Sequence, residues 1–413
     1  MPEMQSSLSL GSPRFSDARL VNLASKQGPL AAWQDAITRG AAHAAAGVTG
    51  EFAVGLRDPH GRTFMAVDRF SIHSLCYRVV NGQMRFAVRA DDLADAATEI
   101  DPQAIFDYLY FHVIPSPRTI YKGIYRLPAA HYALFEDGEL TVAPYWLPTF
   151  EEQHNPSFDA LRDEFRQLLK DSVAAQLDGS KPACFLSGGT DSSTVAGMVA
   201  LASGKVAASY SIGFDAQGYD EMEYARLAAG HFKTEHHEYY VTPDDLVRSI
   251  ADVAASFDQP FGNSSALPSY YCAKMALDDG VTKILAGDGG DELFGGNSRY
   301  AKQKMFDWYE HVPGLIQKEL LEPLLATRAA GAFALTRKAG SYVEQARVPM
   351  PDRLQMYNLI TRLGVAEVLT PQLLAQVDIR APLQLQQQVW HGVQGCSHLN
   401  KGLAFDWRFT LAE

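Results

Sequence analysis

The stretch Ser187-Gly188-Gly189-Thr190-Asp191-Ser192-Ser193 decides the fold class of this chain. It follows a short apolar run at 183–186 and precedes an apolar helical pattern that starts at Thr194. A strand, a glycine turn and a helix start together aim backbone N–H groups at an anion, and the helix dipole favours negative charge there. The stretch has no Gly-Lys-Ser/Thr ending and no G-x-G-x-x-G spacing, so it is neither a Walker loop nor a dinucleotide fingerprint. We expect it to cradle nucleotide phosphates; the alternative is a Ser/Gly turn that only caps a helix through Asp191 or Ser192.

A second glycine-rich stretch, AGDGGDELFGG, occupies residues 286–296. It follows an apolar run at 282–286, so its carboxylates, which include Asp288 and Asp291, stand at the end of an expected strand. Carboxylate oxygens bind Mg²⁺ and leave room for phosphates and water. We expect a magnesium or proton-transfer site here; the alternative is an acidic surface turn.

The pattern around these stretches predicts an α/β domain with a doubly wound parallel sheet. Apolar strands are expected at 183–186, 207–214, 236–241 and 282–286, with helices at 159–176, 191–203, 220–232 and 265–279. Helical crossovers of this length join parallel strands, and ligands bind at the carboxyl ends of such strands. Beyond about residue 298 the pattern is mostly helical.

The first half of the chain has a different pattern, typical of antiparallel β structure. Extended segments are expected at 51–56, 63–67, 84–88 and 131–135, with turns at 58–61, Asn81-Gly82 and Asp137-Gly138 and a helix at 102–111. Asn-Gly and Asp-Gly between apolar runs are strong hairpin signals. A polar segment at 147–157 reads as a linker, which gives an N-terminal antiparallel β-rich domain at 1–147 and an α/β domain at 158–413.

Composition narrows the classes of partner. The 413 residues carry 36 Lys and Arg against 48 Asp and Glu, for a net charge of −12. This balance argues against nonspecific binding to nucleic acid or to a membrane surface. The four cysteines are far apart and suggest neither disulfides nor zinc, and no stretch reads as a membrane span or signal peptide, so we expect a cytoplasmic protein.

Two further groups of residues are ambiguous. The backbone at 211–213 could read adenine beside the phosphate loop, or it could be plain core strand, and Asp220 could cap the following helix. His236, His237 and Glu238 could suggest a metal, but adjacent strand residues point to opposite faces, so we favour a structural role. Cys184 reads as a small core residue.

The motifs SGGTDSS, YSIGF, YDEMEYARLAA, EHHE and AGDGGDELFGG occur in an order that resembles the asparagine synthetase family, whose loop is that of the ATP pyrophosphatases. The resemblance implies an enzyme that adenylates a carboxylate with ATP, releases pyrophosphate and forms an amide with ammonia or an amine. It implies magnesium ligation by Asp191 and Asp291, and a role for Asp288 in orienting or deprotonating the amine. It implies an ATP site lined by Leu186, Ser187, Gly188, Gly189, Thr190, Asp191, Ser192, Ser193, Ile212, Ala286 and Gly287.

The first half resembles the glutaminase domain of that family at 50–53, 67–77, 119–127 and 145–146. The family nucleophile is a cysteine directly after the initiator Met, whereas this sequence has Pro2 and no cysteine before Cys76. A stretch that binds glutamine also has no convincing match. We therefore expect a degenerate domain that does not hydrolyse glutamine; the alternative is a wrongly chosen start codon.

The end of the sequence also departs from the family, in which roughly a hundred more residues usually follow. We find no match for the family lysine that contacts phosphate; Lys283 and Lys401 are weak candidates, and Glu344–Pro349 mimics a family stretch but lies upstream of the expected place. A truncated chain and a naturally short one both remain open, and so does a homodimer. The alternatives in function are a ligase like the β-lactam synthetases or lasso-peptide cyclases, and an inactive nucleotide-binding or regulatory subunit.

Overall fold

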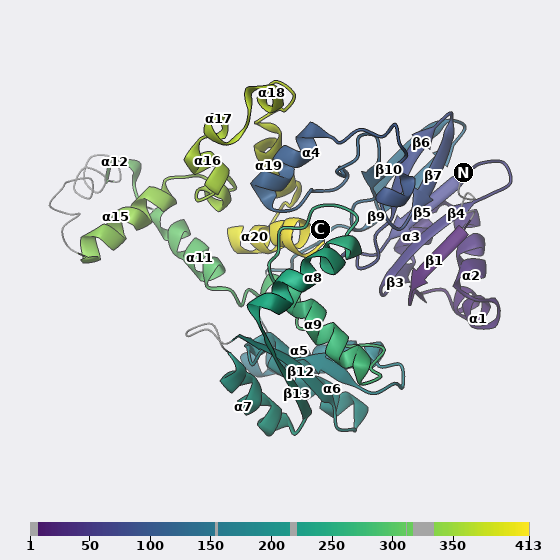
Figure 1. Cartoon of the computed structure of the whole chain (residues 1–413), viewed down its shortest axis with the longest axis horizontal. Helices are drawn as coiled ribbons and strands as arrows, with labels where there is room; N and C mark the ends of the chain where they lie inside the picture. The colour runs from purple at the N-terminus through teal and green to yellow at the C-terminus, as the bar shows by residue number, and fades with distance from the viewer. Residues whose placement is uncertain (1–6, 153–155, 215–220, 311, 317–333, 413) are drawn as a thin grey trace. The chain divides into compact units, whose positions relative to one another are not determined.

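The structure is a computed structural model that describes residues 7–152, 156–214, 221–310, 312–316 and 334–412 (Figure 1). The chain forms two compact units. Unit 1 comprises residues 1–150, 258–261 and 297–413, and unit 2 comprises 151–257 and 262–296. The expected α/β domain at 158–413 is thus divided, because residues 297–413 pack with the first half of the chain. None of the helices in the described part of the chain is long and apolar enough to cross a membrane.

Two antiparallel sheets form the first half of unit 1, as the alternating pattern predicts. A five-stranded sheet has the order β1 (Ser7–Gly11), β4 (Phe52–Arg57), β5 (Thr63–Val67), β9 (His131–Glu136) and β10 (Glu139–Pro144). A three-stranded sheet has the order β7 (Gln83–Ala87), β6 (Cys76–Val80) and β8 (Tyr125–Arg126). The short strands β2 (Arg14–Phe15) and β3 (Val48–Thr49) pair with each other.

The expected hairpin turns are present. Asn81 and Gly82 join β6 to β7 with φ of 52° and 70°, and Asp137 and Gly138 join β9 to β10 with φ of 53° and 82°. Two successive residues with positive φ are the signature of the turn whose twist matches an antiparallel pair.

The central strands β4 and β5 of the five-stranded sheet are buried on both faces, so two cores flank them. Phe52, Val54 and Leu56 of β4 point to one face, where three helices pack, and one of these helices carries the buried Trp33. The intervening Ala53 points to the other face, toward the three-stranded sheet. The three helices are α1 (Ala18–Gln27), α2 (Pro29–Ala36) and α3 (Ala41–Ala46), and the sequence pattern did not reveal them. The 3₁₀ turn η1 (Ile37–Arg39) lies between α2 and α3.

The rest of unit 1 is helical. Helix α4 (Pro102–Phe111) has the predicted bounds, begins at the N-cap Asp101, and packs through Phe106 and Tyr110 on Ile360 and Leu369. The other elements are η2 (Asp91–Leu93), α11 (Ser298–Glu310), α12 (Gly314–Ile316), α15 (Ala334–Ala346), η4 (Asp352–Gln355), α16 (Leu359–Leu363), α17 (Val365–Val368), α18 (Pro371–Leu374), α19 (Ala381–Gly392), α20 (His398–Asp406) and the π-helical turn η5 (Trp407–Leu411).

Unit 2 is built on a parallel sheet with the order β11 (Ala183–Phe185), β12 (Ala208–Phe214) and β13 (Glu235–Val241). The strand expected at 282–286 is wrong as a full strand: it is reduced to an isolated parallel bridge between Cys184 and Leu285. Two backbone hydrogen bonds of 2.9 Å tie Leu285 to Ala183 and Phe185 before the chain turns away at the glycines.

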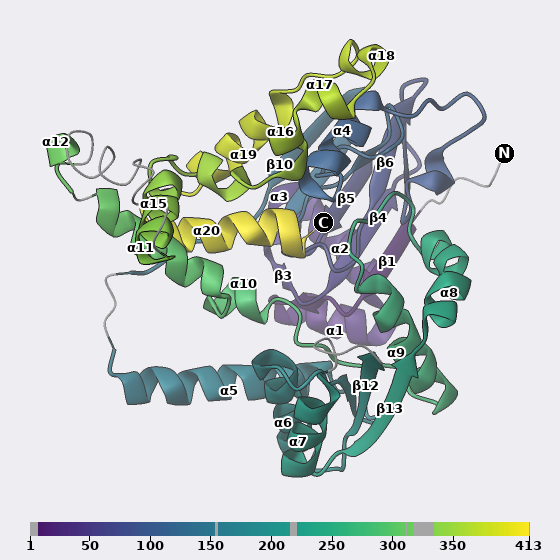
Figure 2. The ribbon, with the colours of Figure 1, turned by 60° about the vertical axis from the view of Figure 1, so that its left-hand side comes forward.

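Helices cover both faces of this sheet (Figure 2), which confirms the doubly wound arrangement. The helices are α5 (Phe158–Gln176), α6 (Thr190–Ser203), α7 (Met222–Phe232), α8 (Pro243–Ser256), α9 (Ala266–Asp278) and α10 (Gly290–Phe294). Helices α5, α6 and α7 pack on one face through Cys184 and Leu186, and α9 packs on the other through Ala183 and Tyr210. The segment around Leu285 lies on the free edge of β11, opposite β12, so the strand order reverses beside β11. Ligands of open parallel sheets bind at such a reversal.

Candidate nucleotide site

The loop between β11 and α6 has the backbone that close packing demands. Gly188 has φ of +83°, and a Cβ atom there would lie 2.4 Å from the backbone N of Ala225. A residue with a side chain would therefore be strained by its backbone and would also clash with α7. The loop is tightened by a 3.2 Å hydrogen bond from the Ser187 N–H to Ser192 Oγ and by a 3.0 Å hydrogen bond between the two hydroxyls.

The start of α6 does not fit the alternative in which the loop only caps the helix through Asp191 or Ser192. The N-cap residue is Gly189, which makes no side-chain cap bond, and Asp191 lies in the first turn. Neither Asp191 nor Ser192 caps the helix in the way the alternative required. The helix N-terminus, with its positive dipole end, is left available to an anion.

The two glycine-rich turns meet at the side chain and backbone of Asp191. A Cβ atom on Gly287 would lie 2.8 Å from the Asp191 carbonyl carbon, and one on Gly290 would lie 2.5 Å from Asp191 Oδ2. A Cβ atom on Gly296 would in turn lie 2.5 Å from Asp291 Oδ1. The lack of a side chain at Gly287 lets the acidic turn approach the backbone of the loop, and the lack of one at Gly290 leaves room for the Asp191 carboxylate.

The charge of Asp291 acts on the Asp191 carboxylate at this meeting point. Burial raises the pKa of Asp191, and the negative charge of Asp291 raises it further. A cation placed between these two carboxylates would offset the unfavourable interaction. Among the residues that the structure describes, no group of three or more His, Cys, Asp or Glu side chains has a metal-binding arrangement. A pair of carboxylates still fits Mg²⁺, which usually takes one or two protein carboxylates and fills its remaining positions with water and substrate phosphate.

A cavity of about 480 Å³ opens where the two turns meet. This volume is in the range of small-molecule sites, roughly 300–1,000 Å³. Eight residues expected in the site line it: Leu186, Ser187, Asp191, Ser192, Ile212, Ala286, Gly287 and Asp288. The expected residues that do not line it are Gly188, Gly189, Thr190, Ser193 and Asp291; the first four lie in the loop and the start of α6, and Asp291 lies in the first turn of α10.

Sequence reasoning missed more than half of the cavity wall. The added residues are Phe185, Tyr210, Ser211, Phe214, Glu221, Met222, Ala225, Ser265, Pro268, Ser269 and Cys272. Ser211 lies within the stretch considered for adenine, but the α9 residues carry no motif and are brought to the cavity only by the fold. No lysine or arginine is among the described residues that line the cavity. Asp220, expected as a helix cap, lies outside the described residues, and α7 begins after Glu221, which makes no side-chain cap bond.

The ambiguous residues of β13 make structural contacts. Ser209 Oγ lies 2.9 Å from His236 Nδ1, and His237 stacks on Tyr210 with ring centroids 4.8 Å apart. Burial lowers the pKa of His236, so the ring tends to stay neutral there. Cys184 is fully buried in the core, and burial raises the pKa of its thiol to about 12.

Neither of the weak lysine candidates is among the residues that line this cavity. Lys283 Nζ donates a 2.8 Å hydrogen bond to Gln176 Oε1 at the end of α5, and Lys401 lies in α20 of unit 1. Arg347, in the stretch that mimics a family motif, follows α15 in unit 1.

In unit 1, the stretch expected to match a glutaminase is organised around a buried aspartate. Asp68 is 2% exposed, and its carboxylate accepts hydrogen bonds from the N–H groups of Phe52, Phe70, Ile72 and His73 at 2.9–3.4 Å. The side chain thus fixes the loop after β5. Cys76 is fully buried in β6, and burial raises the pKa of its thiol to about 11.

Comparison with known proteins agrees with this architecture. The model of the asparagine synthase family matches residues 164–409, and that of the glutamine amidotransferase domain matches 34–146. Asparagine synthetase [glutamine-hydrolyzing] 1 of Bacillus subtilis is 30% identical over 292 residues, which cover 70% of this chain and 45% of the relative. A putative asparagine synthetase of Methanocaldococcus jannaschii is 35% identical over 225 residues, covering 53% and 42%.

More distant relatives carry other names. Amidase chyE of Penicillium rubens is 29% identical over 271 residues, covering 60% of this chain and 40% of the relative. Among solved structures, an NH3-dependent NAD synthetase from Campylobacter jejuni covers 57% of this chain and 98% of its own, at 14% identity and a TM-score of 0.24, which is too distant to inform the site. The chain spans about half the length of the curated relatives it matches. With the asparagine synthase model matched over 164–409 and the amidotransferase model over 34–146, the chain belongs to the asparagine synthase family.

Proposed function

We propose that this chain is an ATP-dependent amide ligase that adenylates a carboxylate, releases pyrophosphate, and passes the acyl group to ammonia or an amine. The observation that carries the proposal is the meeting of the two glycine-rich turns at one cavity, beside the point where the strand order reverses. Family membership supports an amide ligase, and the cavity supplies a place for its nucleotide.

The loop residues are assigned to the phosphates. Ser187 and Ser192 line the cavity, and their hydroxyls, together with the N–H groups at the start of α6, would donate hydrogen bonds to the phosphates. The apolar wall around Leu186 and Ile212 suits the adenine and ribose. ATP would therefore lie with its base against β12 and its phosphates against α6.

Charge balance supports a requirement for magnesium. Among the residues that the structure describes, the cavity wall offers the carboxylates of Asp191, Glu221 and Asp288 and no cationic side chain, so a triphosphate entering alone would meet like charge there. Asp191 and Asp291 would hold Mg²⁺, which when bound neutralises the phosphate charge and stabilises the departing pyrophosphate. Burial and the charge of Asp291 raise the pKa of Asp191, and a cation bound there would offset that unfavourable interaction.

Asp288 is assigned to the second half-reaction. A carboxylate is a poor electrophile, and adenylation gives it a good leaving group. An amine that attacks the acyl group gains a positive charge, and it must lose a proton to become an amide. Asp288 lines the cavity from the acidic turn, where its carboxylate can orient the amine and accept that proton.

We further propose that the amidotransferase-like half does not feed the reaction by hydrolysing glutamine. The space between its two sheets is filled by Met65, Met84, Phe86 and Phe135, all 5% exposed or less. Gly55 is packed against the ring of Phe86, where a Cβ atom would lie 2.5 Å away. The thiol of Cys76 is buried with a raised pKa, so it would be a poor nucleophile.

Pyrophosphate release tests this function. The protein is given ATP, Mg²⁺ and panels of carboxylates with ammonia, primary amines or glutamine. Pyrophosphate and AMP that form only with carboxylate and amine together support the ligase, whereas ATP binding without turnover favours a regulatory subunit. Glutamate release coupled to turnover would overturn the proposal for the first half.

Matched variants tie turnover to the cavity. Asp191→Asn should abolish pyrophosphate release, and Asp252→Asn, which changes an exposed carboxylate on α8, should not. Equal rates of pyrophosphate release by the two variants would show that Asp191 of the phosphate loop takes no part in the reaction. An intramolecular amide product with no added amine would point instead to a cyclising ligase.

A further inference from the structure

A short segment of the chain, Asp258–Phe261, lies between two helices of unit 2 but belongs to unit 1. The chain leaves unit 2 after Phe257, contributes these four residues to unit 1, and re-enters unit 2 at Gly262. Four residues bury little apolar surface of their own, so specific contacts are needed to keep a segment this short in place on unit 1.

Residues of the amidotransferase-like half make hydrogen bonds with the first two residues of the segment, Asp258 and Gln259. Asp258 Oδ1 accepts a 2.9 Å hydrogen bond from the guanidinium of Arg126, and Oδ2 accepts a 2.8 Å hydrogen bond from the Ala90 N–H. Both partners of the ion pair have side chains that are only 12% exposed. Gln259 Oε1 accepts a 3.2 Å hydrogen bond from the Ile120 N–H.

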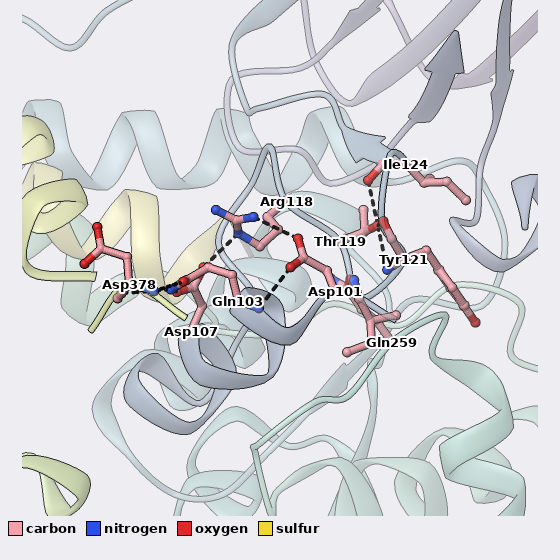
Figure 3. Close-up of polar contacts among 10 residues, drawn as sticks. Asp101, Gln103, Asp107, Arg118, Thr119, Tyr121, Ile124, Gln259 and Asp378 are labelled. Atoms are coloured by element: carbon pink, nitrogen blue, oxygen red, sulfur yellow. Dashed lines mark hydrogen bonds and ion pairs between the residues drawn. The ribbon is translucent and has the colours of Figure 1, made fainter. Parts of the chain in front are cut away.

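The residues that hold the segment are themselves fixed. Arg126 ends β8 and pairs in register with the buried Cys76 of β6. Figure 3 shows the loop that supplies Ile120: Thr119 Oγ1 donates to the Ile124 carbonyl at 2.8 Å. At the start of the same loop, Arg118 bridges Asp101 and Asp107, and Asp107 also binds Gln103, which reaches the backbone of Asp378 (Figure 3). These contacts that fix the loop all lie within unit 1.

The segment leads directly into the wall of the nucleotide cavity. Only residues 262–265 separate it from α9, which starts at Ala266. Ser265, Pro268, Ser269 and Cys272 line the cavity, and all four belong to the first turns of α9 or to its N-cap. The chain just before this wall is thus anchored by a buried ion pair in the other unit.

We propose that Asp258 and Arg126 are positioning residues for the nucleotide cavity: the amidotransferase-like half holds Asp258 and so fixes the start of α9. This proposal rests on the proposed function for its effect on ATP, but the anchoring of α9 stands apart from it. It gives the first half of the chain a role in the synthetase reaction that needs no glutamine hydrolysis. Neither residue touches the cavity itself, so both act through α9.

The test compares Asp258→Asn with Asp406→Asn in the full chain. Asp406 is a matched control because its side chain is 13% exposed and pairs with Arg299 at 2.9 Å in unit 1, and neither residue is among the partners of Asp258 or Gln259 given above. Amide hydrogen exchange is measured over 262–272 and over 190–203 without nucleotide. Asp258→Asn should speed exchange in the first range only, and Asp406→Asn should leave both ranges as in the unaltered protein.

The kinetic arm measures the KM for ATP and kcat by pyrophosphate release. Asp258→Asn should raise the KM by between about twofold and about 30-fold, the range expected when a connecting contact is lost, with a much smaller change in kcat. Arg126→Met should behave alike, and Arg126→Lys, which keeps the charge, should recover part of the loss. If Asp258→Asn does not fold, the Arg126→Lys and Arg126→Met pair provides the same comparison.

Unchanged exchange in 262–272, or a KM that rises as much in Asp406→Asn as in Asp258→Asn, would overturn the proposal. Its failure is distinguishable from failure of the proposed function. An unaltered protein that neither binds ATP nor releases pyrophosphate refutes the ligase assignment, while the exchange result still decides whether Asp258 anchors α9.

Discussion

Asp191 Oδ2 lies so close to Gly290 that a Cβ atom on that glycine would be 2.5 Å from the oxygen. This close approach brings the acidic turn against Asp191 of the phosphate loop, whose carboxylate we propose as a ligand of magnesium. Gly290→Ala should therefore displace the Asp191 side chain, because the backbone of the turn has no room to retreat. We expect pyrophosphate release to fall by at least the tenfold that about 1.4 kcal/mol represents.

A matched glycine separates this steric effect from a general effect on helices. Gly230 lies in α7 of the same unit, and a Cβ atom there would meet nothing within 4 Å. Gly230→Ala should raise the free energy of unfolding by about 0.5–1 kcal/mol and leave turnover unchanged. Thermal unfolding and pyrophosphate assays check both variants, and normal activity of Gly290→Ala would refute the proposed geometry.

The effect of the Asp291 charge on Asp191 predicts a dependence of stability on pH. The pKa of Asp191 is raised from 3.8 by burial and then by the Asp291 charge. A raised carboxyl pKa gives stability that is present below the unfolded pKa and is lost as pH rises through the folded pKa. Asp291→Asn removes the second cause, so without metal this variant should have a higher Tm than the unaltered protein at pH 7.

The advantage of Asp291→Asn should disappear in acid, where Asp191 is protonated in both proteins. Saturating Mg²⁺ and ATP should reverse the order, because the variant lacks one carboxylate for the cation. Thermal unfolding from pH 3 to pH 7, with and without Mg²⁺, measures all three comparisons. A Tm at pH 7 that is lower for Asp291→Asn without metal would show that the two carboxylates do not repel each other.

Asp288 is expected to affect chemistry more than nucleotide binding. Asp288→Asn keeps the size of the side chain in the cavity wall but cannot accept the amine proton. We expect kcat to fall by about 10²–10⁴-fold, the usual contribution of a positioned base, while the Kd for ATP changes little. Calorimetry and turnover measure the two quantities, with Asp278→Asn on the exposed side of α9 as control. A large loss of ATP affinity with normal kcat would move Asp288 to the binding site.

Sequence reasoning succeeded where a feature depends on neighbouring residues. The turn at Asn81-Gly82 needs positive φ at two successive positions, and those two residues adopt it most readily. Helix α4 has a Pro at its first position and an Asp cap, so its bounds were predictable. The phosphate loop likewise carries its glycines, hydroxyls and carboxylate within seven residues.

It failed where distant segments determine the result. The cavity wall formed by α9 comes from residues such as Ser269 that carry no motif, and only packing brings them to the loop. The run at 282–286 is apolar enough for a strand but meets only β11, through one bridge, before the glycines turn the chain. Helices α2 and α3 have only eight and six residues, and most of their buried side chains are alanines, so their sequence shows little contrast between an apolar and a polar side.

Helix α8, which the sequence analysis also missed, carries a signal that could have revealed it. Thr242 and Asp245 form a capping box: the Thr242 hydroxyl donates to Asp245 Oδ2 at 2.7 Å and accepts from the Asp245 N–H at 3.2 Å. Thr242→Ala should lower the free energy of unfolding by about 1 kcal/mol, within the range for lost N-caps. Thr242→Ser keeps the hydroxyl and should lose far less, which makes it the control.

The same variant should change how stability responds to acid. Hydrogen bonds from the backbone and hydroxyl of Thr242 lower the pKa of Asp245 from 3.8 to about 2. A lowered carboxyl pKa gives stability that is present above the unfolded pKa and is lost as pH falls through the folded one. Without the hydroxyl bond the folded pKa rises, so the deficit of Thr242→Ala relative to the unaltered protein should shrink between pH 4 and pH 2. Thermal unfolding across that window measures it, and a deficit that stays constant with pH would show that the hydroxyl does not act through the Asp245 carboxylate.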